Sequence, residues 1–455
     1  MNKIKSALNI VKGCLVFVWG TFINVFRIIR SPGKSFKGIY GVSFYRNSAY
    51  LIANSGLSLF LGLVFNVLIT RMYSAADVGY GSAIISVLNF LGFIGTLGFG
   101  YYVVRYLPSA DDKAKILNSL LTIGGVTAAV ACLIFLSGIS WWSPKLMFLL
   151  HKPYFFISFV IMGAIFTVYS IVAQVFIAFR KSGYTLLSQG VIASVLELVL
   201  VIVMSAFGVY GIVASQGIGL AIALVACIFV FLPRIIPHYR PLAVIQLRTT
   251  RETISYSFAN YAVDGLTNLP FWVLSLLVLN TYGAAPNAYF YMSWTMSTVL
   301  LAIAYGISTS LFAEGAHEVR NVGGDIVRSL KLILLIVLPA AILMIVFSDK
   351  LLLLYGGAYS AAGTQVLRLF SLSVLPGSIN LLYFSLARVE KWLKNLLLVC
   401  VAMAVLTIFS GYLLLPHFGI VGVGISRLFV QIVMLFFTVP KLLHRIKIRN
   451  TDINQ

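Results

Sequence analysis

Long apolar runs separated by short polar segments dominate this chain. Each run spans roughly 20 residues, the length at which an α-helix crosses the hydrocarbon core of a bilayer. The first set of runs covers residues 49–69, 82–105, 116–137, 154–176, 186–207 and 211–232. The second set covers residues 254–279, 288–312, 327–347, 366–387, 393–415 and 419–438. The pattern predicts an all-α, polytopic membrane protein with about twelve transmembrane helices.

The second half of the chain repeats the first about 209 positions later. In that register Tyr73, Ala75, Ala76 and Tyr80 match Tyr282, Ala284, Ala285 and Tyr289. A register of 208 fits further along, where Tyr210-Gly211-Ile212-Val213 coincides with Phe418-Gly419-Ile420-Val421. Because six spans are an even number, both halves enter the membrane from the same side. We therefore expect two parallel-repeat six-helix lobes around a central cavity, an arrangement typical of transporters.

The repeat and the polar segments divide the chain into five parts. The N-terminal lobe covers residues 46–233 and the C-terminal lobe residues 253–440, with a basic inter-lobe loop at 234–252. A basic tail covers residues 441–455, and a basic N-terminal extension covers residues 1–45. Apolar residues of the extension recur every three or four positions, which favours an interfacial helix over an extra span or a signal peptide.

The charge is strongly basic, with 33 Lys and Arg against 12 Asp and Glu and a formal net charge of +21. If the N-terminus is cytoplasmic, 27 of the 33 basic residues fall on cytoplasmic segments. This is the positive-inside asymmetry. It predicts a cytoplasmic-membrane protein with both termini inside, and it explains the charge without nucleic acid as a partner. The basic face is also expected to attract anionic membrane lipids.

Two segments carry a resemblance to a known family. One is Thr70-Arg71-Met72-Tyr73-Ser74-Ala75-Ala76-Asp77-Val78-Gly79-Tyr80, and the other is Leu354-Tyr355-Gly356-Gly357-Ala358-Tyr359-Ser360-Ala361-Ala362. Both resemble segments of the polysaccharide biosynthesis (oligosaccharide repeat-unit flippase) family. That family is part of the multidrug/oligosaccharidyl-lipid/polysaccharide exporter superfamily. The resemblance implies two six-helix lobes and a cargo that is a sugar chain on a polyprenyl phosphate or pyrophosphate, with polysaccharide assembly enzymes as possible partners.

Ionisable residues deep in the spans are the first candidates for chemistry. Each would cost about 2.5 to 3.5 kcal/mol if it faced lipid. Arg427 lies near the middle of the last span, where it could contact a phosphate or pair with a buried acid. Asp264 lies deep in the seventh span, where it could bind a coupling ion or neutralise Arg427.

The remaining candidates are weaker. Glu197, isolated in the fifth span, is a second candidate for ion coupling. Arg368, about one turn inside its span, could contact substrate or anchor the helix at the interface. Asn260 and Gln431, near Asp264 and Arg427, are interpreted as hydrogen-bonding groups for the substrate.

The sequence contains no metal-ligand cluster, nucleophilic triad or phosphate-binding loop, so we expect no metal, no cofactor and no catalytic residue. The four cysteines lie in apolar surroundings and are expected to be buried packing residues. A glycine row at residues 92–100 is interpreted as close helix packing. The sequence thus favours a flippase for a lipid-linked oligosaccharide. A cation-coupled multidrug-type exporter of the same fold is the alternative, and a membrane-bound polymerase or glycosyltransferase is a distant one.

Overall fold

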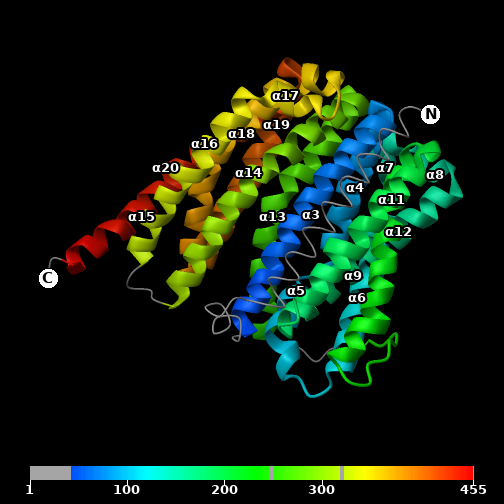
Figure 1. Ribbon diagram of the computed structural model, residues 1–455, viewed down its shortest axis with the longest axis horizontal. Helices are drawn as coiled ribbons and strands as arrows, with labels where there is room; N and C mark the ends of the chain where they lie inside the picture. The colour runs from blue at the N-terminus through cyan, green and yellow to red at the C-terminus, as the bar shows by residue number, and fades with distance from the viewer. Residues whose placement is uncertain (1–42, 246–250, 318–321, 454–455) are drawn as a thin grey trace, which may run out of the picture. The chain divides into compact units, whose positions relative to one another are not determined.

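The computed structural model describes residues 43–245, 251–317 and 322–453, which are drawn as ribbons in Figure 1. Within these ranges the regular structure is helical and contains no strand. The predicted extension, residues 1–45, lies outside the described residues except for the start of α3 at Ser43. The interfacial helix therefore stays a prediction.

The chain divides into two compact units, Met1–Tyr261 and Ala262–Gln455. The division falls inside α13 (Arg251–Tyr282), a few residues beyond the loop at which the sequence separates the lobes. In unit 1 the Tyr261 ring stacks on Phe93 with 4.4 Å between ring centroids. The first turns of α13 therefore pack with unit 1, and the predicted domain boundaries stay predictions.

Unit 1 contains the first six long helical segments. The α-helices are α3 (Ser43–Met72), α4 (Ala75–Thr96), α5 (Phe99–Tyr106), α6 (Lys113–Ser137), α7 (Ile139–Trp142), α8 (Phe148–His151), α9 (Pro153–Ala178), α10 (Gly183–Thr185), α11 (Ser194–Val203) and α12 (Val209–Ala226). Two segments are π-helical, η3 (Leu186–Ala193) before α11 and η5 (Cys227–Phe231) after α12. Four short 3₁₀ turns complete the unit, η1 (Leu107–Ser109), η2 (Pro144–Leu146), η4 (Ser205–Phe207) and η6 (Leu232–Arg234).

Unit 2 contains the rest of α13 and the helices that follow it. They are α14 (Ala284–His317), α15 (Val322–Leu332), α16 (Leu338–Val346), α17 (Ser348–Leu353), α18 (Gly357–Val389), α19 (Leu393–Phe418) and α20 (Ile420–Ile453), with the π-helical η8 (Ile333–Val337) between α15 and α16. Proline lies inside several of these helices. In a membrane such prolines are tolerated where neighbouring groups satisfy the freed carbonyl.

Twelve helices of the described chain are long and apolar enough to cross a membrane, six in the first half and six in the second. They overlap the predicted runs, as where 154–176 lies within Pro153–Ala178 and 393–415 within Leu393–Phe418. The bounds of the predicted run 82–105 are wrong, because α4 ends at Thr96 and the backbone takes positive φ at Leu97 and Gly98 before α5 begins. A chain in hydrocarbon must satisfy its backbone polar groups internally, which helices do. The predicted all-α, multi-pass membrane fold is confirmed.

The glycine row at the end of α4 forms a close helix contact. A Cβ at Gly95 would lie 2.6 Å from both the Cβ of Ala128 on α6 and the hydroxyl oxygen of Thr167 on α9. That hydroxyl donates to the backbone oxygen of Gly92 at 2.9 Å. Because these glycines of α4 carry no side chain, the helices α4, α6 and α9 approach one another closely, as predicted. The three cysteines of the described residues, Cys132, Cys227 and Cys400, are likewise buried and free.

The start of the inter-lobe loop is fixed to unit 1. Tyr239 is buried, and its hydroxyl donates to the side-chain oxygen of Asn118 on α6 at 2.8 Å. The amide of Asn118 in turn donates to the backbone oxygen of Arg240 at 2.8 Å. Burial raises the pKa of Tyr239 to about 12, so this hydroxyl keeps its proton at neutral pH.

In unit 2, α18 packs against both α14 and α20. The Ser293 hydroxyl of α14 donates to the backbone oxygen of Gly363, and Ser308 donates to that of Leu381. These buried hydroxyls thus join α14 to α18 and fix how far one helix is shifted along the other, which apolar contacts alone would leave unspecified. This packing brings residues of α14, α18 and α20 together around the candidate site.

Candidate functional site

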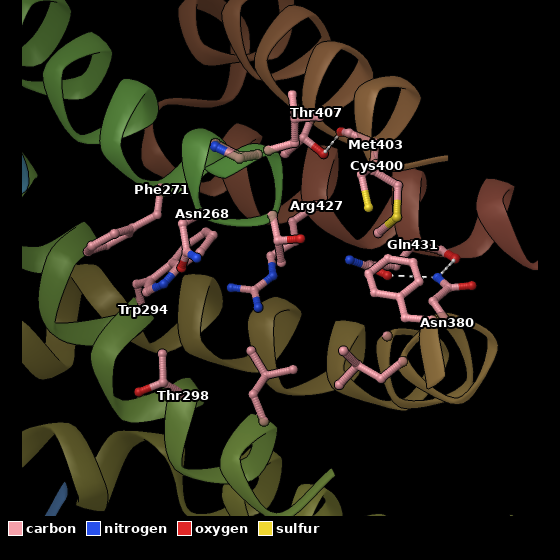
Figure 2. Close-up of a pocket in the computed structure, with 18 residues that line it drawn as sticks. Asn268, Phe271, Trp294, Thr298, Asn380, Cys400, Met403, Thr407, Arg427 and Gln431 are labelled. Carbon is pink, nitrogen blue, oxygen red and sulfur yellow. Dashed lines mark hydrogen bonds between the residues drawn. The ribbon is translucent and has the colours of Figure 1, made fainter. Parts of the chain in front are cut away.

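A cavity of about 220 Å³ lies within unit 2. Residues of α13, α14, α18, α19 and α20 line it (Figure 2). Two of the four residues predicted to bind substrate, Arg427 and Gln431, lie together in its wall. Its polar lining residues are Thr267, Asn268, Thr298, Asn380, Thr407, Arg427 and Gln431.

Arg427 is a buried cation held between aromatic rings. It is 7% exposed, and its guanidinium carbon lies 3.9 Å from the centre of the Trp294 ring and 5.3 Å from that of Phe370. Such contacts contribute about 2 kcal/mol when desolvated, whereas burying an unpaired charge costs several kcal/mol. Within the described residues Arg427 has no ion pair, and its Nη1 is buried without a hydrogen-bond partner. The guanidinium therefore keeps its capacity to bind an anion in the cavity.

Gln431 lies one helical turn beyond Arg427 on α20 and is held by Asn380 of α18. The Asn380 amide nitrogen donates to the Gln431 backbone oxygen at 3.0 Å and to its side-chain oxygen at 2.8 Å. Asn380 accepts in turn from the hydroxyl of Thr438 at 2.8 Å. Asn380 and Thr438 are 1% and 0% exposed, so this chain of bonds fixes Gln431 from inside the protein.

Asp264 forms its ion pair with Arg388, from the last turn of α18, at 3.4 Å. The predicted alternative in which Asp264 neutralises Arg427 is therefore corrected. Both partners are partly exposed, 41% for the Asp264 side chain and 28% for Arg388. The physical reason is the position of the two arginines. The end of α18 brings Arg388 next to Asp264. The Arg427 side chain instead lies against the rings of Trp294 and Phe370.

The other polar residues of α13 divide between the two units. Asn260 belongs to unit 1 and is not part of the cavity wall. Asn268 and Pro270 belong to unit 2 and line the cavity. The Asn268 amide nitrogen donates to the backbone oxygen of Asp264 at 2.9 Å. Helix α13 therefore contributes Asn268 to the site, and a substrate contact by Asn260 stays a prediction.

Arg368 points at the end of α16. Its Nε donates to the Ser348 hydroxyl at 3.0 Å and to the backbone oxygen of Ile345 at 3.3 Å. A cationic side chain in this position satisfies a carbonyl at a helix C-terminus. Arg368 is not part of the cavity wall, and both its contact with substrate and its anchoring at the interface stay predictions.

Glu197 lies in unit 1, in the first turn of α11, just after the π-helix η3. Its carboxyl group interacts with the side chain of Gln216 on α12. At Gly219, one turn further along α12, a Cβ would lie 2.9 Å from the Ala193 backbone oxygen. The two helices therefore approach closely around Glu197. A role in ion coupling stays a prediction.

The described residues contain no group of three or more His, Cys, Asp or Glu side chains that could hold a metal ion. The cavity lining combines one cation with amides, hydroxyls, a thiol and aromatic rings.

The sequence reading missed Trp294, Phe370 and Thr438. One signal was available for Trp294, which lies well inside the span Ala284–Phe312 although tryptophan is enriched at the ends of spans. Thr438 carries no such signal, because its role depends on which residue of α18 faces it.

Twelve apolar helices, with a cavity lined by a buried cation inside one unit, define a multi-pass membrane protein. The family profile described as polysaccharide biosynthesis protein matches residues 44–285, more than half of the chain. The chain therefore belongs to the polysaccharide biosynthesis protein family. A search of curated protein sequences finds no significant match.

Solved structures share the fold at low sequence identity. The lipid II flippase MurJ, in an inward closed conformation, has a TM-score of 0.69 at 14% identity, covering 88% of this chain and 90% of MurJ. An inward-facing multidrug resistance MATE family transporter of the MOP superfamily has a TM-score of 0.63 at 13% identity, with 89% and 96% covered. A MOP superfamily transporter from Pyrococcus furiosus has a TM-score of 0.62 at 13% identity, with 90% and 96% covered. At this identity the likeness establishes the fold, which is that of the superfamily indicated by the sequence.

Proposed function

We propose that the protein is a flippase that moves a polyprenyl-(pyro)phosphate-linked oligosaccharide across the cytoplasmic membrane by alternating access. Family membership and the fold support a transporter of this kind. The observation that carries the proposal is Arg427, a buried cation without a counter-anion among the described residues, in the wall of a polar cavity. A phosphate group of the cargo supplies the missing anion.

The physical barrier for such a cargo is the transfer of hydroxyls and a phosphate through hydrocarbon, which offers them no hydrogen bonds. Trp294 covers one face of the Arg427 guanidinium and leaves its N–H edges for oxygen acceptors. An arginine bound in this way attracts a phosphate oxygen more strongly in the cavity than at the surface, because the local dielectric constant is lower.

The topology adds a driving force. We place both termini and the basic loops in the cytoplasm, where they contact anionic lipids and the enzymes of polysaccharide assembly. An anionic headgroup moving outward then gains about 2.3 kcal/mol per charge for every 100 mV of inside-negative potential. Transport driven by this potential does not require a coupling ion.

Ion coupling through Glu197 or Asp264 remains a part of the proposal that can be tested separately. Arg388 already supplies a cation at Asp264, which favours Glu197 as the coupling group. Its partner Gln216 is neutral, so Glu197 can exchange a proton without losing an ion pair. A transport rate that depends on a pH gradient in the native protein and not in Glu197→Gln would support this role, and an unchanged dependence would exclude it.

A multidrug-type exporter is the second candidate, because transporters of that class share the fold. The charge of Arg427 disfavours cationic drugs as cargo, since like charges repel most strongly in a cavity of low dielectric constant. A polymerase or glycosyltransferase is a distant third, with no arrangement of side chains in the described residues that favours it.

Transport by the purified protein in lipid vesicles separates these candidates. The cargoes are a fluorescent polyprenyl pyrophosphate carrying a disaccharide, the same compound without the sugar, and a cationic dye. We expect the glycolipid to cross in the presence of the protein and the dye to be unaffected. Transport of the dye without transport of the glycolipid would contradict the flippase and support the multidrug-type exporter.

A further inference from the structure

The hydrogen bonds around Asn380 determine which way the Gln431 amide faces. A backbone oxygen can only accept, so the Asn380 group bonded to the Gln431 backbone oxygen must be its NH₂. The same NH₂ also donates to the side chain of Gln431, which must therefore present its oxygen to Asn380. The nitrogen of the Gln431 amide consequently lies on the opposite side, and Figure 2 shows it turned away from Asn380.

Arg427 and Gln431 are four residues apart on α20, so their side chains lie on the same face of the helix. Both line the cavity. Arg427 contributes a guanidinium whose Nη1 has no hydrogen-bond partner in the protein, and Gln431 contributes an amide N–H whose direction is fixed. Two adjacent donors, one of them charged, form a cradle for a single oxyanion.

The threonine hydroxyls of the cavity wall are left as acceptors. The hydroxyl of Thr298 donates to the backbone oxygen of Thr295 and that of Thr407 to the backbone oxygen of Met403, both at 2.6 Å. Each hydroxyl proton is used within its helix, which leaves only the oxygen lone pairs for a ligand. Asn268 uses one amide hydrogen on the backbone oxygen of Asp264 at 2.9 Å, which leaves its side-chain oxygen as an acceptor and its second N–H as a donor.

We propose that Arg427 and Gln431 form an oxyanion cradle, that Asn380 and Thr438 are its positioning residues, and that the ligand is a hydroxyl-bearing sugar ring next to a phosphate or carboxylate. The ring hydroxyls donate to Thr298, Thr407 and Asn268, while the anion accepts from the cradle. This inference rests on the proposed function for the identity of the cargo, since a lipid-linked oligosaccharide offers such an anion in two places. One is the phosphate that joins carrier and first sugar, and the other is an acidic sugar in the chain.

Ligand-observed NMR titrations on the full chain in detergent micelles test the chemical class. The probes are glucose 1-phosphate, glucuronic acid and glucose. We expect both anionic probes to bind at least about tenfold more tightly than glucose, because a charge-assisted hydrogen bond is worth that much. Equal binding of the three probes would overturn the cradle.

Competition distinguishes the two sources of the anion. A short-chain polyprenyl phosphate without sugar is titrated against bound glucose 1-phosphate. Displacement assigns the cradle to the carrier phosphate. Retention of the bound sugar, together with tight binding of glucuronic acid, assigns it to an acidic sugar. Failure of every anionic probe to bind contradicts the proposal.

Substitutions at Gln431 test the second donor. Gln431→Leu removes it and is expected to weaken anion binding about tenfold. Gln431→Glu keeps the oxygen that accepts from Asn380 but replaces the N–H by a negative oxygen next to Arg427. We expect it to weaken anion binding on the order of a hundredfold and to leave glucose unaffected. Unchanged anion binding in both variants would remove Gln431 from the site.

The positioning residues are tested at Thr438, where the change in shape is smallest. Thr438→Val removes the hydroxyl that fixes Asn380 and is expected to weaken anion binding about fivefold, while Thr438→Ser restores it. Ser385→Ala is the matched control, because it removes a buried hydrogen bond between α18 and α14 and does not touch the cavity. A purely structural role of Thr438 would lower binding of glucose and of the anions alike, and would contradict positioning.

The outcomes separate this inference from the proposed function. Selective anion binding without glycolipid transport in vesicles would leave the cradle in place and overturn the flippase. Glycolipid transport that Gln431→Glu leaves at the wild-type rate, with no selective anion binding, would support the flippase and overturn the cradle.

Discussion

The two units differ most where the repeat aligns Arg427 with Gly219, 208 positions earlier. In unit 1 the glycine lets α12 approach the backbone of η3 and α11, since a Cβ there would lie 2.9 Å from the Ala193 oxygen and 3.3 Å from the Glu197 nitrogen. In unit 2 the same position carries a buried arginine that faces a cavity. One repeat uses the position for close packing and the other for a charge.

The neighbouring positions repeat this contrast. In the same register Gln431 corresponds to Ala223 and Asn380 to Val172, both of which are 0% exposed in the apolar core of unit 1. A hydrogen-bonded polar cluster in unit 2 thus replaces an apolar contact in unit 1. The fold tolerates both solutions, and we place the binding of the anion in unit 2, whose polar groups retain unused hydrogen-bonding capacity.

The largest expected effect is at Gly219. Gly219→Leu places a side chain against the α11 backbone, where the clash cannot be relieved by rotating a flexible neighbour. We expect a loss of about 3 kcal/mol or more, seen as loss of the monodisperse peak in fluorescence-detected size-exclusion chromatography. Gly306→Leu is the control, because nothing lies within 4 Å of a Cβ there. A normal peak for Gly219→Leu would contradict the claim that unit 1 needs a glycine at this position for close helix packing.

A substitution at Arg427 is expected to change the stability in the opposite direction. Arg427→Met replaces a buried unpaired cation with an apolar side chain of similar length, so thermal stability is expected to rise by about 1 to 2 kcal/mol. Anion binding is expected to be lost at the same time. The thermal unfolding midpoint and the NMR titration measure the two effects. A destabilised variant would show that Arg427 has a structural partner.

The sequence predicted the number of spans, the family and two of the cavity residues, because hydrophobic periodicity and charged residues within apolar runs are visible in one dimension. It did not predict the partner of Asp264, because Arg388 becomes its neighbour only through the packing of α13 with α18. It also missed Trp294 and Thr438, since aromatic and hydroxyl residues inside a span have many equivalent packing roles. A residue that acts by orienting a neighbouring side chain can be identified only when the fold shows which side chains are neighbours.

A smaller effect is expected at Tyr239, which anchors the inter-lobe loop to unit 1. Tyr239→Phe leaves the Asn118 oxygen without its donor and is expected to cost about 1 kcal/mol, with anion binding in unit 2 unchanged. In the native protein the bond is fully present below the unfolded-state pKa of about 10. It is lost as the pH rises through the folded-state pKa of about 12. Thermal unfolding between pH 7 and pH 9 should therefore differ between the two proteins by a constant amount, and convergence in this range would contradict the assignment.

The smallest effect is expected at the Asp264–Arg388 pair, whose partners are partly exposed. A double-mutant cycle with Asp264→Asn and Arg388→Gln should give a coupling energy of about 0.5 kcal/mol. Arg427→Met combined with Asp264→Asn should be additive. Strong coupling between Asp264 and Arg427 would restore the pairing that the structure corrects.

The central claim is that Arg427 binds the anion of a lipid-linked oligosaccharide during its translocation. The most direct measurement is the initial rate of glycolipid translocation in vesicles for the native protein, Arg427→Lys and Arg427→Met. Arg328→Gln, which changes a largely exposed arginine of the same unit, is the control. The account predicts native rates for the control, a partial rate for lysine, and a loss of about a hundredfold for methionine. Native transport by Arg427→Met would contradict it.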